Sequence, residues 1–219
     1  MGKLEVPVLY EDNACIVFNK PAGLLTIPTT KNEDHTLVNY VNQQYQTPGT
    51  LHPAHRLDRD TSGVIIFAKG KDNQQILMQA FKEKKVKKSY IAFVHGKLMP
   101  PVGKIRIPIK DFYQRKFQKH LPAQSALTEY QVIDYGRDYT QVDVRPITGR
   151  TNQIRIHFAK LKHPLVGEDK YAFRKDFELR FRRTALHAAI VEFPQPVTGK
   201  MITVKADLPP DMEEFLKTH

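Results

Sequence analysis

The sequence predicts an α+β fold whose core is a mainly antiparallel, mixed β-sheet with a few flanking helices. Three observations support this class. Strand-like segments recur along the 219 residues, helical patterns are few, and there is neither a regular βαβ alternation nor a repeat of fixed period. No linker rich in Pro, Gly or Ser divides the chain, so we expect residues 1–219 to form a single domain.

Eight segments rich in β-branched and aromatic residues account for the predicted sheet. They are residues 6–10, 14–20, 63–69, 89–96, 126–135, 139–146, 186–193 and 201–206. The single cysteine, Cys15, lies in the second segment between apolar neighbours, which favours a small buried strand residue over a nucleophile or a metal ligand.

Two helices are predicted between these strands from apolar residues at helical spacing. The first follows Asp34 and has Leu37 and Val41 one turn apart. The second follows Asp72 and places four apolar residues on one face, namely Ile76, Leu77, Ala80 and Phe81. Both aspartates are candidate N-cap residues.

A third helix is predicted in "TGRTNQIRIHFAKLKHP", capped by Thr151 and ended by His163-Pro164. Two arginines, Arg150 and Arg155, lie close to its N-terminal end. Since cations normally suit the opposite pole of the helix dipole, we expect a nearby anion to offset their cost.

The charge balance indicates a protein that binds a polyanion. The chain carries 34 Lys and Arg against 23 Asp and Glu, and its net charge of +11 favours a nucleic acid partner. No apolar stretch approaches the roughly 20 residues that span a bilayer, and the N-terminal residues match neither a signal peptide nor a myristoylation motif. We therefore expect no membrane association and a cytoplasmic location. Without a heptad pattern or an apolar helix face, a monomer is expected.

Three stretches carry much of the positive charge. Residues 82–90 hold five lysines, residues 174–183 mix five basic residues with two phenylalanines, and residues 100–124 form an irregular basic connection, either a hairpin insertion or a loop. Such cations contact phosphates, and aromatic rings stack on exposed bases. Charge runs are also common on solvated faces, and Phe177 and Phe181 have the spacing of one packed helical face.

One carboxylate has an unusual setting. In "HRLDRDTSG", Asp58 lies between Arg56 and Arg59, whose guanidinium groups favour its ionised form. The segment fails as an EF-hand calcium loop, because its twelfth position is Lys69 where a bidentate Glu is required. For Asp60 the better interpretation is a carboxylate that stabilises the turn. For Asp58 the residues alone leave that role and a catalytic role open.

The same segment resembles the HRLD-x-x-TSG signature of the RluA-type RNA pseudouridine synthases. The match extends to "NKPAG", "KKSY", "PITGRTNQIRIH", "HPLVG" and "LHA", which occur in the family's order and together cover nearly the whole chain. The resemblance implies the pseudouridine synthase catalytic fold without the S4-type RNA-binding domain of some relatives. It also implies that uridines in ribosomal or transfer RNA are isomerised with no cofactor and no metal.

The resemblance implies roles for individual residues. Family members detach uracil from its ribose, rotate it and rejoin it through a ring carbon, and their essential aspartate corresponds to Asp58, acting as nucleophile or as base. Arg155 matches the basic residue that pairs with that aspartate, and Tyr90 matches the tyrosine that stacks on the target base. Without the resemblance, Arg155 would be a structural ion-pair residue and Tyr90 a packed strand residue.

Contacts with RNA are implied for a further set of residues. The target nucleotide must leave its stack, and Arg56 is the candidate to fill the vacated space, with a phosphate contact as its alternative role. His55 is expected to serve as a structural hydrogen-bonding residue rather than as a proton shuttle. The other predicted contacts are Arg59, Lys87, Lys88, Arg150 and Leu186.

The chain departs from the family pattern at three positions. Asn152 and Glu168 stand where the family often has His and Asp, and Phe193 replaces the His of a usual His-Pro pair. None of these is a position on which the chemistry depends, although Asn152 bears on the local RNA contacts.

Two other functions stay open at this point. A non-catalytic RNA-binding or assembly factor would have the same charge, but the intact Asp58, Tyr90 and Arg155 argue against it. A metal-dependent hydrolase using Asp58 and Asp60 would need further ligands, for which the sequence offers no convincing cluster.

Overall fold

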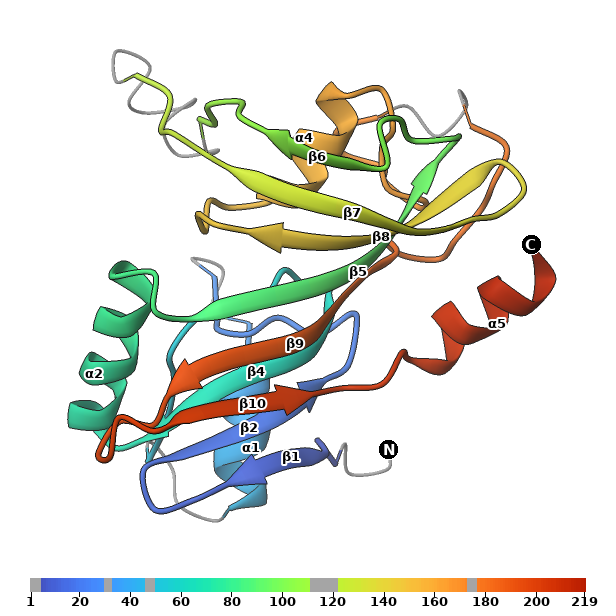
Figure 1. Cartoon of the computed structure of the whole chain (residues 1–219). Coiled ribbons are helices and arrows are strands. Elements are labelled where there is room, and N and C mark those ends of the chain that lie inside the picture. Colours follow the sequence, from blue (N-terminus) through green and yellow to red (C-terminus); the bar gives the residue numbers. More distant parts are fainter. Residues whose placement is uncertain (1–4, 30–32, 46–49, 111–121, 173–176) are drawn as a thin grey trace. The chain divides into compact units, whose positions relative to one another are not determined.

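The computed structural model describes residues 5–29, 33–45, 50–110, 122–172 and 177–219 (Figure 1). Two compact units are present. The first comprises Met1–Lys88 and His187–Thr218, and the second Ser89–Leu186 together with the last residue. The chain passes between them inside two strands, β5 (Lys87–His95) and β9 (Leu186–Pro194). The single domain expected over residues 1–219 stays a prediction.

The first unit contains a sheet with the strand order β1-β2-β4-β9-β10, to which β3 adds beside β4. Its strands, besides β9, are β1 (Val8–Glu11), β2 (Cys15–Lys20), β3 (Leu51–Pro53), β4 (Ser62–Lys69) and β10 (Met201–Lys205). All pairs are antiparallel except β4 with β9, which run parallel. At that junction Gly63 has φ of +108°, and a Cβ there would collide with the carbonyl oxygen of Ala188, so only glycine fits.

Helices α1 (Leu37–Gln44) and α2 (Lys71–Lys82) cover opposite faces of this sheet. Alternate residues of β2 explain why, since the side chains of a strand point to the two faces in turn. Cys15 and Val17 belong to the cluster that contains Leu77 of α2, whereas Phe18 contacts Tyr45 at the end of α1. Cys15 is fully buried in β2, as expected, and burial raises the pKa of its thiol to about 12.

Both predicted N-caps in this unit are wrong. The N-cap of α1 is Thr36, because the N–H groups of its first turn donate to the main chain of residues 25 and 26 and need no aspartate. The N-cap of α2 is Gly70, and Asp72 lies inside the first turn, where a negative charge suits the helix dipole. A fourth helix, α5 (Pro210–Thr218), was not predicted, and it buries Met212 and Phe215.

The second unit is built on an antiparallel sheet with the strand order β5-β8-β7-β6 (Figure 1). Besides β5 it contains β6 (Val102–Ile105), β7 (Thr128–Tyr135) and β8 (Tyr139–Pro146). Helix α4 (Gln153–Lys160) packs on this sheet, with Phe158 against Tyr130 at 5.8 Å between ring centroids. Within residues 100–124, β6 pairs with β7, which lies outside this segment, and Ile109 forms an isolated antiparallel bridge with Gln124. Residues 111–121 lie outside the described chain, so the choice between a hairpin insertion and a loop stays open.

The boundaries of α4 differ from those predicted. Its N-cap is Asn152 rather than Thr151, with a left-handed backbone (φ +55°) that asparagine tolerates better than threonine does. The helix ends at Lys160, before His163-Pro164.

All eight predicted strands are present, and the expected α+β class with a mainly antiparallel sheet is confirmed. None of the described helices has the length and hydropathy that a membrane span requires.

Candidate active site

The predicted site residues fall into two groups, one in each unit. The first unit carries His55, Arg56, Asp58, Arg59, Lys87 and Lys88, and the second carries Tyr90, Arg150, Arg155 and Leu186. The pairing of Asp58 with Arg155 that the resemblance implies stays a prediction.

Asp58 lies in the loop between β3 and β4, called here the Asp58 loop (residues 56–61). Its side chain is half-buried, and its carbonyl oxygen accepts a hydrogen bond of 3.2 Å from the N–H of Thr61, which closes a tight turn. Arg56 and Arg59 on either side are exposed. Arg59 forms an exposed ion pair with Glu33 at 3.5 Å.

Lys20, the buried lysine of the segment "NKPAG", supports the Asp58 loop. Lys20 has no exposed surface, and its ammonium group donates 2.9 Å hydrogen bonds to the carbonyl oxygens of Pro21 and Arg59. A buried cation is tolerated where polar partners replace water. The sequence motif was matched, but nothing in its pattern indicated that its lysine holds the residue after Asp58.

His55 is hydrogen-bonded and packed within the first unit. Its Nε2 accepts a 3.2 Å hydrogen bond from the N–H of Ile66, and its ring packs on Phe81 with centroids 4.7 Å apart. Burial, assisted by the charge of Lys88, lowers the pKa of His55 to about 3. These contacts agree with the hydrogen-bonding role predicted for His55.

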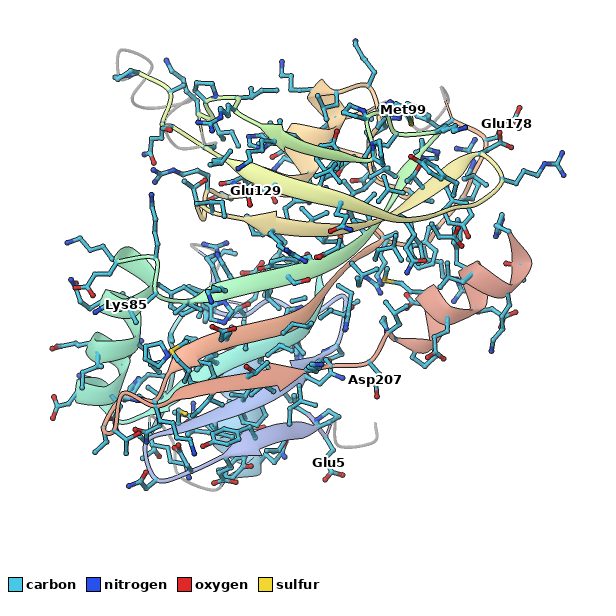
Figure 2. The ribbon with its side chains drawn as sticks, in the orientation of Figure 1. Glu5, Lys85, Met99, Glu129, Glu178 and Asp207 are labelled. Carbon is cyan, nitrogen blue, oxygen red and sulfur yellow. The ribbon has the colours of Figure 1, made fainter. Side chains whose placement is uncertain are left out.

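The lysines after α2 differ in their surroundings. The ammonium group of Lys88 lies over the ring of Phe81 at 5.8 Å, and burial lowers its pKa. Lys87 is exposed and forms a 2.8 Å ion pair with Glu192. Lys85 extends into solvent, as Figure 2 shows. This segment therefore presents both half-buried and solvated cations.

Arg155 is almost fully buried in α4 and forms a bidentate ion pair with Glu168. Its Nε and Nη2 donate to the two carboxylate oxygens at 2.7 and 2.8 Å, and the two side chains are 10% and 1% exposed. Glu168 also accepts from the N–H groups of Lys170 and Tyr171. Burial alone would raise the pKa of Glu168, but the hydrogen bonds and charge of Arg155 outweigh it and hold this pKa below its ordinary value. The anion expected near Arg155 is thus supplied by the chain itself.

Asn152, one of the three positions that depart from the family pattern, has a structural role here. Its amide nitrogen donates to the hydroxyl of Tyr171 at 2.9 Å, and its oxygen lies 3.5 Å from Nη1 of Arg155. The ring of Tyr171 faces the guanidinium of Arg155, with 5.4 Å to the centroid. Together these contacts orient Arg155.

Arg150 is exposed, and the loop that carries it is fixed by the buried Gln153. The side-chain oxygen of Gln153 accepts from the N–H of Arg150 and from the hydroxyl of Thr148, and its nitrogen donates to Leu127 and Thr128. All the hydrogen-bonding capacity of this amide is used. Sequence reasoning did not single out Gln153, because two of its partners, Leu127 and Thr128, lie 26 and 25 residues away along the chain.

Tyr90 and Leu186 are buried strand residues. Tyr90 lies in β5 opposite Val144 and is 9% exposed. Leu186 begins β9, is 3% exposed, and accepts a hydrogen bond from Arg183 through its carbonyl oxygen.

Phe177 and Phe181, for which the sequence left base stacking and a packed helical face open, are engaged inside the second unit. Phe177 stacks on His95 at 4.4 Å, and Phe181 faces the guanidinium of Arg183 at 5.5 Å. Neither lies in a helix, and two of the basic residues of this stretch, Arg174 and Lys175, lie outside the described chain. Within the described ranges, no group of three or more His, Cys, Asp and Glu residues could hold a metal ion.

Comparison with known proteins adds to this geometry. Residues 14–160 match the family described as RNA pseudouridylate synthase. The chain is 34% identical to "Ribosomal large subunit pseudouridine synthase D" of Buchnera aphidicola subsp. Acyrthosiphon pisum (strain APS), covering 95% of this chain and 72% of that relative. It is 36% identical to "Dual-specificity RNA pseudouridine synthase RluA" of Escherichia coli (strain K12), covering 91% of each. The solved structure "Human RNA Pseudouridylate Synthase Domain Containing 1" superimposes with a TM-score of 0.76 at 26% identity, covering 94% of this chain and 84% of that one.

Proposed function

Because this chain belongs to the RNA pseudouridylate synthase family, and is an RNA pseudouridine synthase, we propose that it isomerises specific uridines of ribosomal RNA, transfer RNA or both, with Asp58 as the essential carboxylate. The family match over residues 14–160 carries the proposal, since it spans Asp58, Tyr90 and Arg155. A non-catalytic RNA-binding factor is set aside, because the relatives named above are synthases.

The substrate class rests on the relatives and on charge. One relative is named for the large ribosomal subunit and another for dual specificity. The net charge of +11 suits a folded RNA, whose loop bases are the ones that a protein can splay out and bind. The proposal places the protein in the cytoplasm as a monomer that acts on such RNAs.

The proposed reaction needs no cofactor. The glycosidic bond between ribose C1′ and uracil N1 breaks, the uracil turns, a bond from C5 to C1′ forms, and the proton leaves C5 for solvent while N1 gains one. In its ionised form Asp58 acts at the ribose, either as nucleophile at C1′ or as base towards a ribose proton. Tyr90 stacks on the uracil, Arg155 supplies the positive charge that pairs with Asp58, and Arg56 fills the space of the flipped nucleotide.

The test uses the purified protein with EDTA and bulk RNA from a synthase-deficient strain, with new pseudouridines mapped by carbodiimide labelling. We expect new sites with the wild-type protein and none with Asp58→Asn, whose RNA affinity and unfolding midpoint stay unchanged. The matched control is Asp60→Asn, which removes a carboxylate from the same turn and should retain turnover. Turnover by Asp58→Asn would contradict the assignment of Asp58.

A further inference from the structure

The N-terminal end of the Asp58 loop is held by a buried hydroxyl. Thr26 is 2% exposed, and its Oγ1 both donates to the carbonyl oxygen of Leu57 at 3.0 Å and accepts from the N–H of Leu57 at 3.2 Å. Leu57 is the residue directly before Asp58. One hydroxyl therefore satisfies both main-chain groups of that residue and fixes its orientation.

Thr26 is itself held by helix α1. The N–H of Val38, in the first turn of the helix, donates to the carbonyl oxygen of Thr26 at 3.1 Å, and the N–H of Leu37 donates to Leu25 at 2.7 Å. The first N–H groups of a helix have no partner within the helix, and here the main chain of residues 25 and 26 supplies their acceptors. The hydroxyl that holds Leu57 thus projects from a segment fastened to a helix.

The other end of the loop is held by a buried histidine. Ser62, where β4 begins, lies 2.9 Å from Nδ1 of His187 through its Oγ, and Nε2 of His187 lies 3.2 Å from the carbonyl oxygen of Ala206. A carbonyl only accepts, so Nε2 donates to it, and in the neutral imidazole Nδ1 then accepts from the Ser62 hydroxyl. Ser62 and His187 are 3% and 1% exposed, and they face each other in the parallel register of β4 and β9.

We propose that Thr26 and His187 are positioning residues that fix the two ends of the Asp58 loop and so set the place of the Asp58 carboxylate. The inference rests on the proposed function of Asp58. A misplacement of about 1 Å in a reacting group can cost up to about 100-fold in rate. The anchors act on Leu57 and Ser62, one residue before Asp58 and four residues after it, so they control the loop without touching the RNA.

The chain offers a matched set of variants at the first anchor. Thr26→Val removes the hydroxyl and keeps the shape, whereas Thr26→Ser keeps the hydroxyl and loses a methyl group. Thr36→Val is the control, because Thr36 is fully buried and pairs with neighbouring Leu25 in an isolated bridge. Within the described chain its hydroxyl is buried without a hydrogen-bond partner.

The measurement is the single-turnover rate constant at saturating enzyme on a mapped RNA, together with RNA affinity and the unfolding midpoint. We expect Thr26→Val to lower the rate constant about 10- to 100-fold at unchanged affinity, and Thr26→Ser and Thr36→Val to stay within about threefold of wild type. A Thr26→Val rate within about twofold of wild type would overturn the proposal. So would equal losses in Thr26→Val and Thr26→Ser, because packing of the methyl group would then explain them.

Ser62→Ala tests the second anchor, and it decides the matter if Thr26→Val fails to fold. Loss of the hydroxyl removes the hydrogen bond between Ser62 and Nδ1 of His187. We expect about a 10-fold lower rate constant with RNA affinity retained. An unchanged rate would remove His187 from the proposal. Asp58→Asn in the same assay separates the two hypotheses: turnover by that variant rejects the proposed function, whereas its inactivity beside a fully active Thr26→Val rejects only the anchors.

Discussion

The two regions that carry the proposed catalytic residues are stabilised by different kinds of contact. Around Asp58, the hydroxyl of Thr26 and the ammonium of Lys20 hold the main chain of the residues before and after it. In the second unit, Arg155 is held through its own guanidinium, which is paired with Glu168. Because these contacts hold the main chain, the stability of the first region does not depend on which side chain stands at position 58. In the second region, the charge proposed for catalysis is also a charge on which the packing of the unit depends.

The largest expected effect tests this dependence in the second unit. Glu168→Gln keeps the shape of the side chain and leaves Arg155 buried without its counter-charge. We expect a loss of about 3–5 kcal/mol in the free energy of unfolding at neutral pH, measured by urea denaturation. The control is Glu33→Gln, which removes the carboxylate of the exposed pair with Arg59 and should lower the free energy of unfolding far less, because solvent screens that pair.

Acid should reduce the loss of unfolding free energy that Glu168→Gln causes. The pKa of Glu168 is lowered in the folded state, so its stabilisation is fully present above the ordinary glutamate pKa of about 4.3 and is lost as the pH falls through the lower folded value. The difference in unfolding free energy between wild type and Glu168→Gln should therefore shrink below about pH 4. Equal losses for Glu168→Gln and Glu33→Gln at neutral pH would show that the two pairs do not differ as described.

The strands could be predicted from sequence, because alternating or continuous apolar runs such as residues 14–20 and 63–69 have few other ways to be buried. The helix starts could not, since α1 begins where a distant segment accepts its N–H groups and Asp34 offers no signal of that. Helix α5 also escaped, because it buries only Met212 and Phe215 from an otherwise polar sequence.

Only the residues of the candidate site that belong to sequence motifs could be predicted. The resemblance singled out Asp58, Tyr90 and Arg155 because it compares residue types at fixed spacing. It gave no information on Thr26, whose hydroxyl bonds to a residue 31 positions away, or on Glu168, which appeared in the sequence only as a departure from the family pattern. Such contacts depend on the packing of segments, so local patterns do not reveal them.

A second, smaller effect compares one histidine from each unit, His55 and His95. Burial lowers the pKa of His55 to about 3, and burial with the charge of Arg180 lowers that of His95 to about 4. Below the ordinary pKa of about 6.5 the unfolded chain takes up a proton that the folded state refuses, so each histidine reduces stability as the pH falls.

The variants His55→Gln and His95→Gln each remove one histidine that takes up a proton only in the unfolded chain. Between about pH 6.5 and pH 5, each should flatten the fall in unfolding free energy by about 2 kcal/mol relative to wild type. Urea denaturation at several pH values measures this slope. A slope unchanged by His55→Gln would mean that its ring takes up a proton in the folded state as readily as in the unfolded chain.

The smallest effect concerns RNA binding and asks whether both units contact the backbone. Arg56 and Arg150 are exposed arginines, one from each unit. If each contacts a phosphate, either alanine variant should reduce the slope of log affinity against log salt concentration by about 0.7 to 0.9. The control is Arg137→Ala, which removes an exposed arginine from the turn between β7 and β8, outside all matched motifs, and should leave the slope unchanged.

A reduced slope for Arg56→Ala alone would confine the phosphate contacts of these two residues to the unit that carries Asp58. Arg150 would then make no phosphate contact, and of the two arginines near the start of α4 only Arg155, which is paired with Glu168, would have an assigned role.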